Sequence, residues 1–398
     1  MPPRPELVPR FEEQGYSAEA VERRRRWIEE KTGADLRHVG SYSFPSEEMR
    51  GNIENPIGVA QVPIGVAGPL LVQGAHARGV FYVPMATTEG TLVRSYERGS
   101  VVLTRAGGVT AHVYLDENQI APVFPFEDVA EAATFVREVE SRFEEVRAEA
   151  ESTTRHGRLL RVECYPIGRH VMLQFRYSTG DAHGMNMIAK ATERACEWLL
   201  AHTNARRYNL FGGLDSEKHA SAALFAGGKG KKVVAGARLS KRLVRSYLNT
   251  TAEGIVEVRQ LNILGQFHSG TLGCNAHLAN GLAALLIACG QDVANLANAA
   301  VGITNLEMIE DGDLYASVTL PSLTLATVGG GTGLGTGREC LEMLGCAGNG
   351  GAPRLAEITA AFLLAGEISL CAAIASGEFV ASHEAYGRNR PAKKDALP

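Results

Sequence analysis

The chain has 398 residues, 45% of them hydrophobic, so it can bury a substantial core and is long enough for two or three domains. Its formal net charge of −4 provides no overall basic field, which argues against nucleic acid as a partner. The seven cysteines are odd in number and form no CxxC pair, so we expect reduced thiols in a cytoplasmic protein, without disulfides or a metal site. No uninterrupted apolar run reaches the roughly 18–20 residues of a membrane span, and we expect no membrane association.

Residues 1–50 are predicted to be a helical segment that precedes the main body. Ser17 can cap a short helix that closes near Gly33. Four consecutive arginines at 23–26 lie within it. Such a run is more typical of a solvated helix face than of nucleic-acid binding, and we interpret it so.

A small α+β domain is predicted at 122–208. The alternating three- and four-residue spacing of apolar side chains predicts an amphipathic helix over 127–150. Two strand-like runs follow at 158–165 and 170–177, and then a helix at about 185–202. This order is the split β-α-β-β-α arrangement of a ferredoxin-like domain, inserted into a larger one.

The larger domain is then made of 51–121 and 209–376, and the polar residues 377–398 form a C-terminal tail or lid. Its centre is expected to be one long helix over 269–300, because helix formers dominate there, proline is absent and apolar residues occur on every side of a 3.6-residue period. A further apolar helix is expected at 353–375. The predicted fold class is therefore α+β, with a large domain around a buried central helix.

The expected central helix contains polar side chains, among them Asn275, Asn280 and Asp292. For each residue alone, packing and hydrogen bonds to nearby backbone are the simpler interpretation. Asp292 is harder to explain in this way, because a carboxylate is costly to bury without a partner, and this makes it a candidate partner for a cation in a functional site.

Three glycine-rich stretches have possible roles in binding phosphates. GDAHGMNM at 180–187 lies between a strand and a helix, so its amides can face an anion or can simply form a turn. GGGTGLGTG at 329–337 lacks the G-x-G-x-x-G spacing and is weak as a dinucleotide fingerprint. GGKGKK at 227–232 could grip phosphates, but we favour a basic surface turn.

Seven motifs together resemble hydroxymethylglutaryl-coenzyme A reductase over nearly the full length, in the style of the soluble catalytic part found in bacteria and archaea. In chain order they are ENPIGVAQVPIGVAGPL (54–70), MATTEG (85–90), GDAHGMNMIAKATE (180–193), CNAHLAN (274–280), IACGQD (287–292), PSLTLATVGGGTGLG (321–335) and the SH pair at 382–383.

The resemblance implies a four-electron reduction of an acyl thioester to a primary alcohol with NADPH as cofactor. The family's catalytic lysine matches Lys218, which would stabilise the negative charge that hydride attack builds on the carbonyl oxygen. Glu89 matches a proton-donating glutamate that must be kept protonated by burial and hydrogen bonding. Asp292 matches the aspartate that tunes this pair, and His383 the histidine that protonates the departing thiolate. Asn275 matches an asparagine that supports the lysine.

The resemblance also assigns binding residues. The small domain would hold NADPH, with the 2′-phosphate reached by a guanidinium; the matching residues are Thr154, Arg155, Asp181, Met185, Asn186 and Met187. His183 replaces a usual methionine there. Coenzyme A would be contacted by Ser95 and Arg98, with Lys241 or Arg242 at its phosphates. Because the family assembles its site across a subunit interface, at least a homodimer is implied.

The chain departs from the family where the acyl carboxylate is normally held. An arginine aligns with Ile120, a serine with Phe211, and a lysine next to the catalytic one with His219. Loss of a bidentate arginine would remove a charge-assisted pair of about 1.5–3 kcal/mol and would favour an apolar acyl end. The substrate is therefore either hydroxymethylglutaryl-CoA or another acyl-CoA or carrier-protein thioester without the distal carboxylate.

Two further hypotheses belong to other classes. A catalytically silent protein that binds coenzyme A or a nucleotide is disfavoured by the joint retention of Glu89, Lys218, Asp292 and His383. A hydrolase that uses Ser382 and His383 lacks a nucleophile-elbow motif.

The position of two residues on the expected central helix creates a conflict. Asn275 and Asp292 are 17 residues apart, about 25 Å along a continuous helix, so both cannot touch one Lys218. Either the helix begins after Asn275, or the two residues serve different copies of the site.

Overall fold

The computed structural model describes residues 6–11 and 15–386. Its α-helices are α1 (Ala18–Thr32), α2 (Leu92–Arg105), α3 (Val129–Ser141), α4 (Phe143–Glu151), α5 (Met185–His202), α6 (Lys241–Leu248), α7 (Ala252–Ser269), α8 (Leu278–Ala288), α9 (Leu296–Ala299), α10 (Gly335–Met343), α11 (Gly351–Ala375) and α12 (Phe379–Tyr386). The short 3-10 helices are η1 (Ser46–Met49), η2 (Ala222–Ala226), η3 (Val293–Asn295), η4 (Glu310–Gly312) and η5 (Gly330–Gly333). The strands are β1 (Ile64–Gly74), β2 (Arg78–Ala86), β3 (Val109–Ile120), β4 (Val123–Pro125), β5 (Arg158–Ile167), β6 (His170–Ser178), β7 (Gly230–Leu239), β8 (Ile303–Met308) and β9 (Leu314–Leu323).

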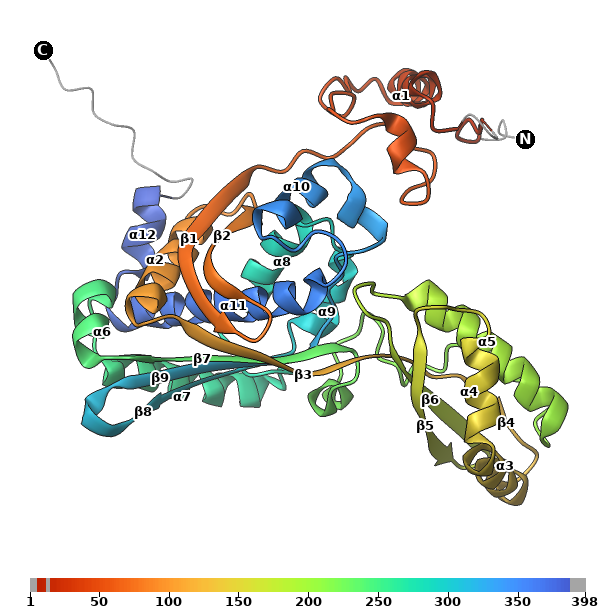
Figure 1. Ribbon diagram of the computed structural model, residues 1–398. Helices are drawn as coiled ribbons and strands as arrows, with labels where there is room; N and C mark the ends of the chain where they lie inside the picture. Colours follow the sequence, from red (N-terminus) through yellow and green to blue (C-terminus); the bar gives the residue numbers. More distant parts are fainter. Residues whose placement is uncertain (1–5, 12–14, 387–398) are drawn as a thin grey trace, which may run out of the picture.

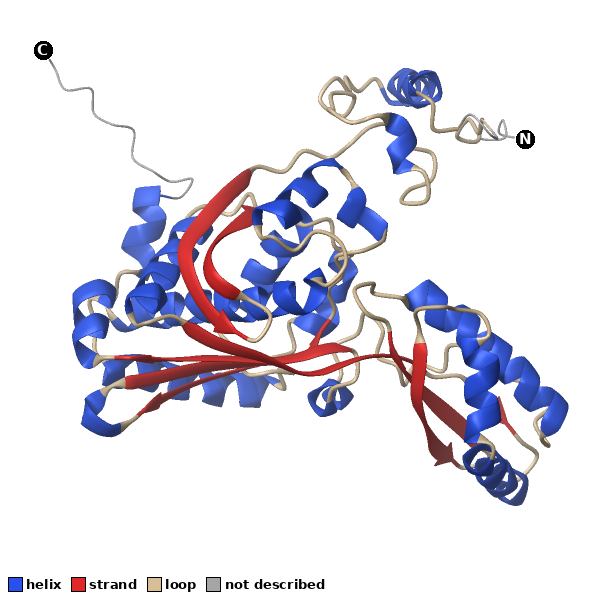
Figure 2. Ribbon diagram, in the orientation of Figure 1, coloured by secondary structure: helices blue, strands red, loops and turns tan. Residues whose placement is uncertain are grey.

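Two bodies are visible, a large one at the left of Figure 1 and a small one at the lower right. The large sheet has the strand order β2-β1-β3-β7-β9-β8, in which only β1 and β3 run parallel. The far end of β3 leaves this sheet and pairs with β6 of the small body. Figure 2 shows β3 passing from one body to the other. One strand therefore fixes the two bodies to each other, and the mixed α+β fold class is confirmed.

The small body follows the order of elements expected at 122–208. The helix expected over 127–150 is interrupted at Arg142 and forms α3 and α4, while α5 spans the expected range. In its sheet β6 pairs with β5 on one side and with the end of β3 and with β4 on the other. Its core is separate from that of the large body. The ferredoxin-like label for this domain stays a prediction.

The expected central helix over 269–300 is wrong as a single element. The preceding helix α7 ends at Ser269, a loop follows, α8 covers only Leu278–Ala288, and the rest forms η3 and α9. Left-handed glycines, at φ 69° for Gly270, 90° for Gly273 and 63° for Gly290, mark the breaks. Such a conformation is disfavoured for residues with a Cβ and does not continue a helix.

The long buried helix of the large body is α11. Most of its 25 residues are buried, and it lies against α2, α7, α8 and the sheet. Its length and apolarity would suit a membrane span, but 83% of its most apolar window is covered by the rest of the protein, as in the core helix of a folded domain. Two fully buried carboxylates on it, Glu357 and Glu367, accept hydrogen bonds from backbone N–H groups of the β1–β2 turn and of the loop before α8. This helix therefore fixes the loop that contains Asn275.

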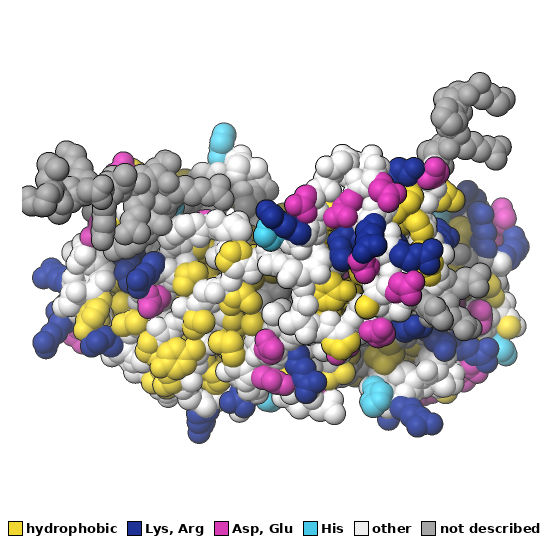
Figure 3. Space-filling model, turned by 90° about the horizontal axis from the view of Figure 1, so that it is seen from above, with side chains coloured by type: hydrophobic (Ala, Val, Ile, Leu, Met, Phe, Trp, Pro, Cys, Tyr) yellow, Lys and Arg dark blue, Asp and Glu magenta, His cyan; other side chains and the backbone are white. Residues whose placement is uncertain are grey.

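The N-terminal helix α1 carries both positive and negative side chains and does not present a uniformly basic face. Positive and negative side chains are interspersed on the right half of the molecule seen from above (Figure 3), where α1 lies. Arg26 pairs with Glu22, and Lys31 lies 2.7 Å from Glu6. Arg23 and Arg26 are exposed, but Arg24 is buried and donates hydrogen bonds to the carbonyls of Pro9 and Pro56. The interpretation of the arginine run as a solvated face is therefore right only in part.

Candidate active site

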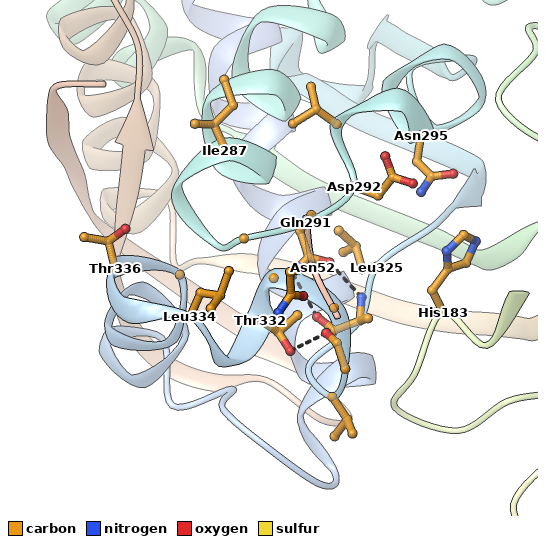
Figure 4. Close-up of a pocket in the computed structure, with 18 of the residues that line it drawn as sticks. Asn52, His183, Ile287, Gln291, Asp292, Asn295, Leu325, Thr332, Leu334 and Thr336 are labelled. Carbon is orange, nitrogen blue, oxygen red and sulfur yellow. Dashed lines mark hydrogen bonds between the residues drawn. The ribbon is translucent and has the colours of Figure 1, made fainter. Parts of the chain in front are cut away.

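A cavity of about 1420 Å³ lies between the large body, the small body and the N-terminal segment. The small body contributes 182–187, and the segment between α5 and η2 contributes Glu217 and Lys218. The large body contributes residues after α8 and the glycine-rich stretch 329–337. In Figure 4, His183 of the small body lies near Asp292 and Asn295 of the large body, away from Ile287 and Thr336. The glycine-rich stretch, which is weak as a dinucleotide fingerprint, thus forms part of the cavity wall.

An ion pair between Lys218 and Asp292 joins two walls of this cavity, with Nζ and Oδ2 2.7 Å apart. The hydrogen bond to Asp292 raises the pKa of Lys218, so the lysine is held as a cation. Burial opposes ionisation of Asp292, but the hydrogen bonds from Lys218 and from the N–H of Ala294 outweigh it and lower the pKa of this carboxyl. A fixed cation at a cavity wall is the arrangement that stabilises an oxyanion during attack on a carbonyl group.

Glu89 lies elsewhere in the same chain. It precedes α2, is exposed, and accepts hydrogen bonds from the Nδ2 of Asn280, which is 3.2 Å from both carboxylate oxygens. Asn280 is in the first turn of α8, whereas Asp292 follows the end of that helix. The expectation that Glu89 is buried is therefore wrong for a single chain. The hydrogen bonds to Glu89 give Asn280 a role beyond packing, which in the sequence is indicated only by its position near Asn275 in the CNAHLAN motif.

Asn275 also makes no contact with Lys218 in one chain. Its Nδ2 donates to the carbonyls of Ala300 and Gly302 at 3.2 and 3.3 Å, and its Oδ1 accepts from the N–H of Leu278. These bonds fix the loop ahead of α8. The helix does begin after Asn275, as the first solution to the conflict on 269–300 requires, but the loop that contains Asn275 does not fold back to Lys218 of the same chain.

Asp181 contacts the large body rather than the cavity. Its two carboxylate oxygens accept hydrogen bonds from the N–H groups of Gly350 and Ala352, at 2.7 and 3.0 Å. These groups belong to the N-terminal end of α11, which no other side chain caps. The structure therefore gives Asp181 a helix-capping role, and its expected contact with a cofactor stays a prediction.

The residues at the start of α5, unlike Asp181, line the cavity and suit an anionic or aromatic ligand. Met185, Asn186 and Met187 form the first turn of α5 and line the cavity, and the cap residue Gly184 provides no side chain to satisfy the N–H groups of that turn. Thr154 donates a hydrogen bond to the sulfur of Met187, and the neighbouring Arg155 is exposed.

The residues expected on the coenzyme A side do not line this cavity. Arg98 donates to the carbonyl of Ser369 at 2.6 Å and pairs with Glu378 at 3.4 Å, and Ser95 donates to the same serine. These bonds connect α2 to the C-terminal end of α11. Lys241 donates to the carbonyl of Asp311 and Arg242 is exposed, both at the start of α6, while His383 is exposed on α12.

The three positions where the carboxylate grip departs from the family are also outside the cavity lining. Ile120 is fully buried in the core of the small body, so its expected contact with an acyl group is replaced by packing. Phe211 is 54% exposed, and His219 is exposed with its Nδ1 2.6 Å from the carbonyl oxygen of Glu217.

GGKGKK at 227–232 is not a basic surface turn, which corrects the sequence interpretation. Lys229 is fully buried and pairs with Glu217, and Lys231 is 3% exposed and lies 2.9 Å from Asp116. Both lysines were missed as buried residues, because lysine is normally solvated unless it is paired. Among the described residues no cluster of three or more histidine, cysteine or acidic side chains suits a metal ion.

Comparisons with known proteins agree with this geometry. A sequence model described as hydroxymethylglutaryl-coenzyme A reductase matches residues 20–388. The 3-hydroxy-3-methylglutaryl-coenzyme A reductase of Methanothermobacter thermautotrophicus is 45% identical over 373 residues, which cover 93% of this chain and 94% of that protein. That of Methanocaldococcus jannaschii is 42% identical and covers 93% of both chains. A class II reductase of this name from Streptococcus pneumoniae, solved with NADPH in open conformations, has a TM-score of 0.66 at 21% identity, covering 92% of this chain and 100% of that one. The chain therefore belongs to the hydroxymethylglutaryl-coenzyme A reductase family.

Proposed function

We propose that the protein reduces hydroxymethylglutaryl-CoA to mevalonate, a four-electron reduction of a thioester to a primary alcohol that consumes NADPH. The observation that carries this proposal is the Lys218–Asp292 pair on the wall of the cavity that also receives the first turn of α5. Family membership supports the same chemistry.

NADPH would bind along the small body. The uncapped first turn of α5 can receive a phosphate or carboxamide group, and Arg155, beside the turn that contacts Met187, can pair with the 2′-phosphate. The related reductase from Streptococcus pneumoniae is described as bound to NADPH. When bound, this cofactor supplies hydride.

The residues of the chain would divide the remaining work. Lys218 stabilises the negative charge on the carbonyl oxygen, and Asp292 keeps the lysine protonated and in place. Glu89 donates a proton to the oxygen, with Asn280 holding its carboxyl group. His383 on α12 protonates the departing thiolate.

A complete site requires two copies of the chain. The 11 residues of α8 span about 16 Å at 1.5 Å per residue, with Glu89 at one end and the Lys218–Asp292 pair beyond the other. Glu89, Asn275 and His383 of one copy would therefore meet Lys218 and Asp292 of another. The apolar side chains on α7 support a subunit interface beside the Asn275 loop, since Leu261, Leu264 and Phe267 are 60%, 68% and 88% exposed.

A second candidate substrate is an acyl-CoA or carrier-protein thioester without the distal carboxylate. The charged side chains in the described cavity lining are Glu217, Lys218 and Asp292, and the lysine is already paired. A substrate carboxylate would meet two carboxylates and no free cation in this lining. This balance of charge in the lining is the observation that favours a neutral acyl group as the second candidate.

The deciding experiment measures NADPH consumption with hydroxymethylglutaryl-CoA, a series of neutral acyl-CoAs and one acyl carrier protein. Turnover of hydroxymethylglutaryl-CoA with poor turnover of the others would establish the first substrate and exclude the second. Unchanged turnover in Lys218→Met would refute the mechanism. No turnover of any thioester, with NADPH binding retained, would establish the catalytically silent alternative.

A further inference from the structure

Lys229 is a fully buried lysine immediately before β7. Its ammonium group forms an ion pair with Glu217 and donates a hydrogen bond to the carbonyl of Gln119 at 3.2 Å. Its third neighbour is the sulfur of Met185, at 3.5 Å. Burial lowers the pKa of Lys229, and Glu217 opposes that effect. A lysine in this environment is costly unless its partner stays in place, so the position of Glu217 is tightly coupled to that of Lys229.

The partner Glu217 directly precedes Lys218 in a turn with an unusual backbone. Ser216 and Lys218 have φ angles of 52° and 56°, in the left-handed region that residues with a Cβ rarely adopt. Such a backbone persists only where surrounding contacts impose it. The contacts here include the Glu217–Lys229 pair and a hydrogen bond of 3.0 Å from Gln119 Nε2 to the carbonyl of Asp215.

We propose that the buried pair of Lys229 and Glu217 positions Lys218 for its contact with Asp292. This inference rests on the proposed function, in which Lys218 is the cation of the reduction. With Glu217 held by Lys229, the left-handed turn directs the next side chain across the cavity to Asp292, 2.7 Å away. Lys229 itself does not line the cavity, so it is a positioning residue.

The pair also controls which carboxylate Lys218 selects. Glu217 lines the cavity beside Lys218 and acts on its charge, so it competes with Asp292 for the ammonium group. Besides Lys218 and Lys229, the only other cationic candidate near Glu217 among the described contacts is His183, whose Nε2 is 3.8 Å from Oε1 and whose pKa is lowered by burial. Without Lys229, Glu217 would therefore turn toward Lys218 and draw it away from Asp292.

The chain offers a matched control. Lys231 follows Lys229 by two residues, is also buried at 3% exposure, and forms its own ion pair with Asp116. Removing its charge should disturb the fold in the same way, but nothing connects it to the turn at 215–218. Lys229→Met and Lys231→Met are thus compared by unfolding midpoint, kcat and KM.

We expect kcat of Lys229→Met to fall by about 100-fold, the scale of a misplacement of about 1 Å, with KM for NADPH within about threefold of wild type. Lys229→Arg, which keeps the charge, should recover to within about tenfold of wild type. Lys231→Met should lower the unfolding midpoint but keep kcat within about threefold. Equal losses of kcat in the two methionine variants would overturn the positioning role.

A second measurement does not depend on turnover, and its variant does not leave the charge of Glu217 without the partner Lys229. In Lys229→Met/Glu217→Gln the pair is removed as a unit, and acetylation of Lys218 by acetic anhydride is followed by mass spectrometry across pH. Release from Asp292 should make Lys218 react faster than in wild type and than in Lys231→Met. An unchanged rate, or wild-type kcat in the double variant, would refute the proposal. If the wild type shows no reductase activity, the labelling result still decides whether the pair positions Lys218.

Discussion

The capping of α11 by Asp181 can be tested against the cofactor role that the resemblance implies. In Asp181→Ala the N–H groups of Gly350 and Ala352 lose their acceptors at the start of a buried 25-residue helix. Loss of an N-cap costs about 0.5–2 kcal/mol, and removal of a carboxylate from the positive end of the helix dipole costs about 0.3–1 kcal/mol. We expect Asp181→Ala to lose about 1–2 kcal/mol of unfolding free energy, and Asp181→Asn, which keeps one acceptor oxygen, about half.

Urea unfolding of the unliganded protein measures the loss, and NADPH titration measures the effect on the cofactor. Asp128 provides the control, because it caps α3 through the N–H groups of Ala130 and Glu131 on the outer part of the small body. Asp128→Ala should lose a similar free energy without changing NADPH affinity. Asp181→Ala should weaken NADPH binding only modestly, by loosening the segment that leads into α5.

The opposite pattern would refute the capping role. If Asp181→Ala unfolds at the wild-type urea concentration while its NADPH affinity collapses, the carboxylate holds the cofactor, as expected from the family motif.

Three further outcomes are expected. In Asp292→Asn the pKa of Lys218 should fall from its raised value toward its ordinary 10.5. Activity that needs protonated Lys218 should therefore be lost at a lower alkaline pH than in wild type, which a pH–rate profile measures. Identical alkaline limbs of the two profiles would exclude the pair from catalysis. The free energy of unfolding that the raised pKa of Lys218 contributes is fully present below about pH 10.5, and it is lost as the pH rises through the pKa of Lys218 in the folded protein. Phe267→Glu places a charge on the exposed face of α7 and should yield inactive monomers in sedimentation velocity, whereas an active monomer would disprove the two-copy site. Glu89→Gln and Lys218→Met, each inactive alone, should recover about a quarter of wild-type activity when equal amounts are refolded together, because half of the dimers then contain one intact site; no recovery would place both residues in one chain.

Periodicity predicted the small body well. The helix at 185–202 and the strands beginning at 158 and 170 lie where the apolar spacing placed them, because each element buries one face against its own core. The break at Arg142 was invisible, since the apolar stripe continues across it from α3 to α4. Hydrophobic periodicity identifies the buried face of a helix, but it does not show where one turn of that helix is interrupted.

The prediction of a single helix over 269–300 was wrong for a different reason. Its apolar residues suit a buried helix at every position, so only the glycines could reveal the breaks. A Cβ on Gly290 would lie 2.3 Å from the carbonyl oxygen of Gly331, which shows that this turn packs directly on the glycine-rich stretch of the cavity wall. That contact joins residues 41 positions apart in the sequence, and propensity carries no information about it.

The site residues separate into those fixed by motif and those fixed by tertiary structure. The resemblance predicted that Asp292 acts on Lys218, and the two side chains form an ion pair, although the segment around Lys218 departs from the family pattern at 211 and 219. The motifs could not show that Glu89 lies at the opposite end of α8, since a motif carries no information about which copy of a chain supplies each residue. Nor could they reveal Lys229, because its burial depends on pairing with Glu217 across a turn.

The charges on one wall of the cavity are balanced within the protein. Glu217 lines the cavity, and its charge is compensated by Lys229, which is fully buried and does not line the cavity. Lys218 is the cation of the described lining and is already paired with Asp292, so this lining offers a ligand no unpaired cation. The same buried pair that holds Lys218 in place therefore also explains why this wall would accept a neutral acyl group more readily than a charged one, so mutating Lys229 and Glu217 together should alter both turnover and the preference between the two substrate classes.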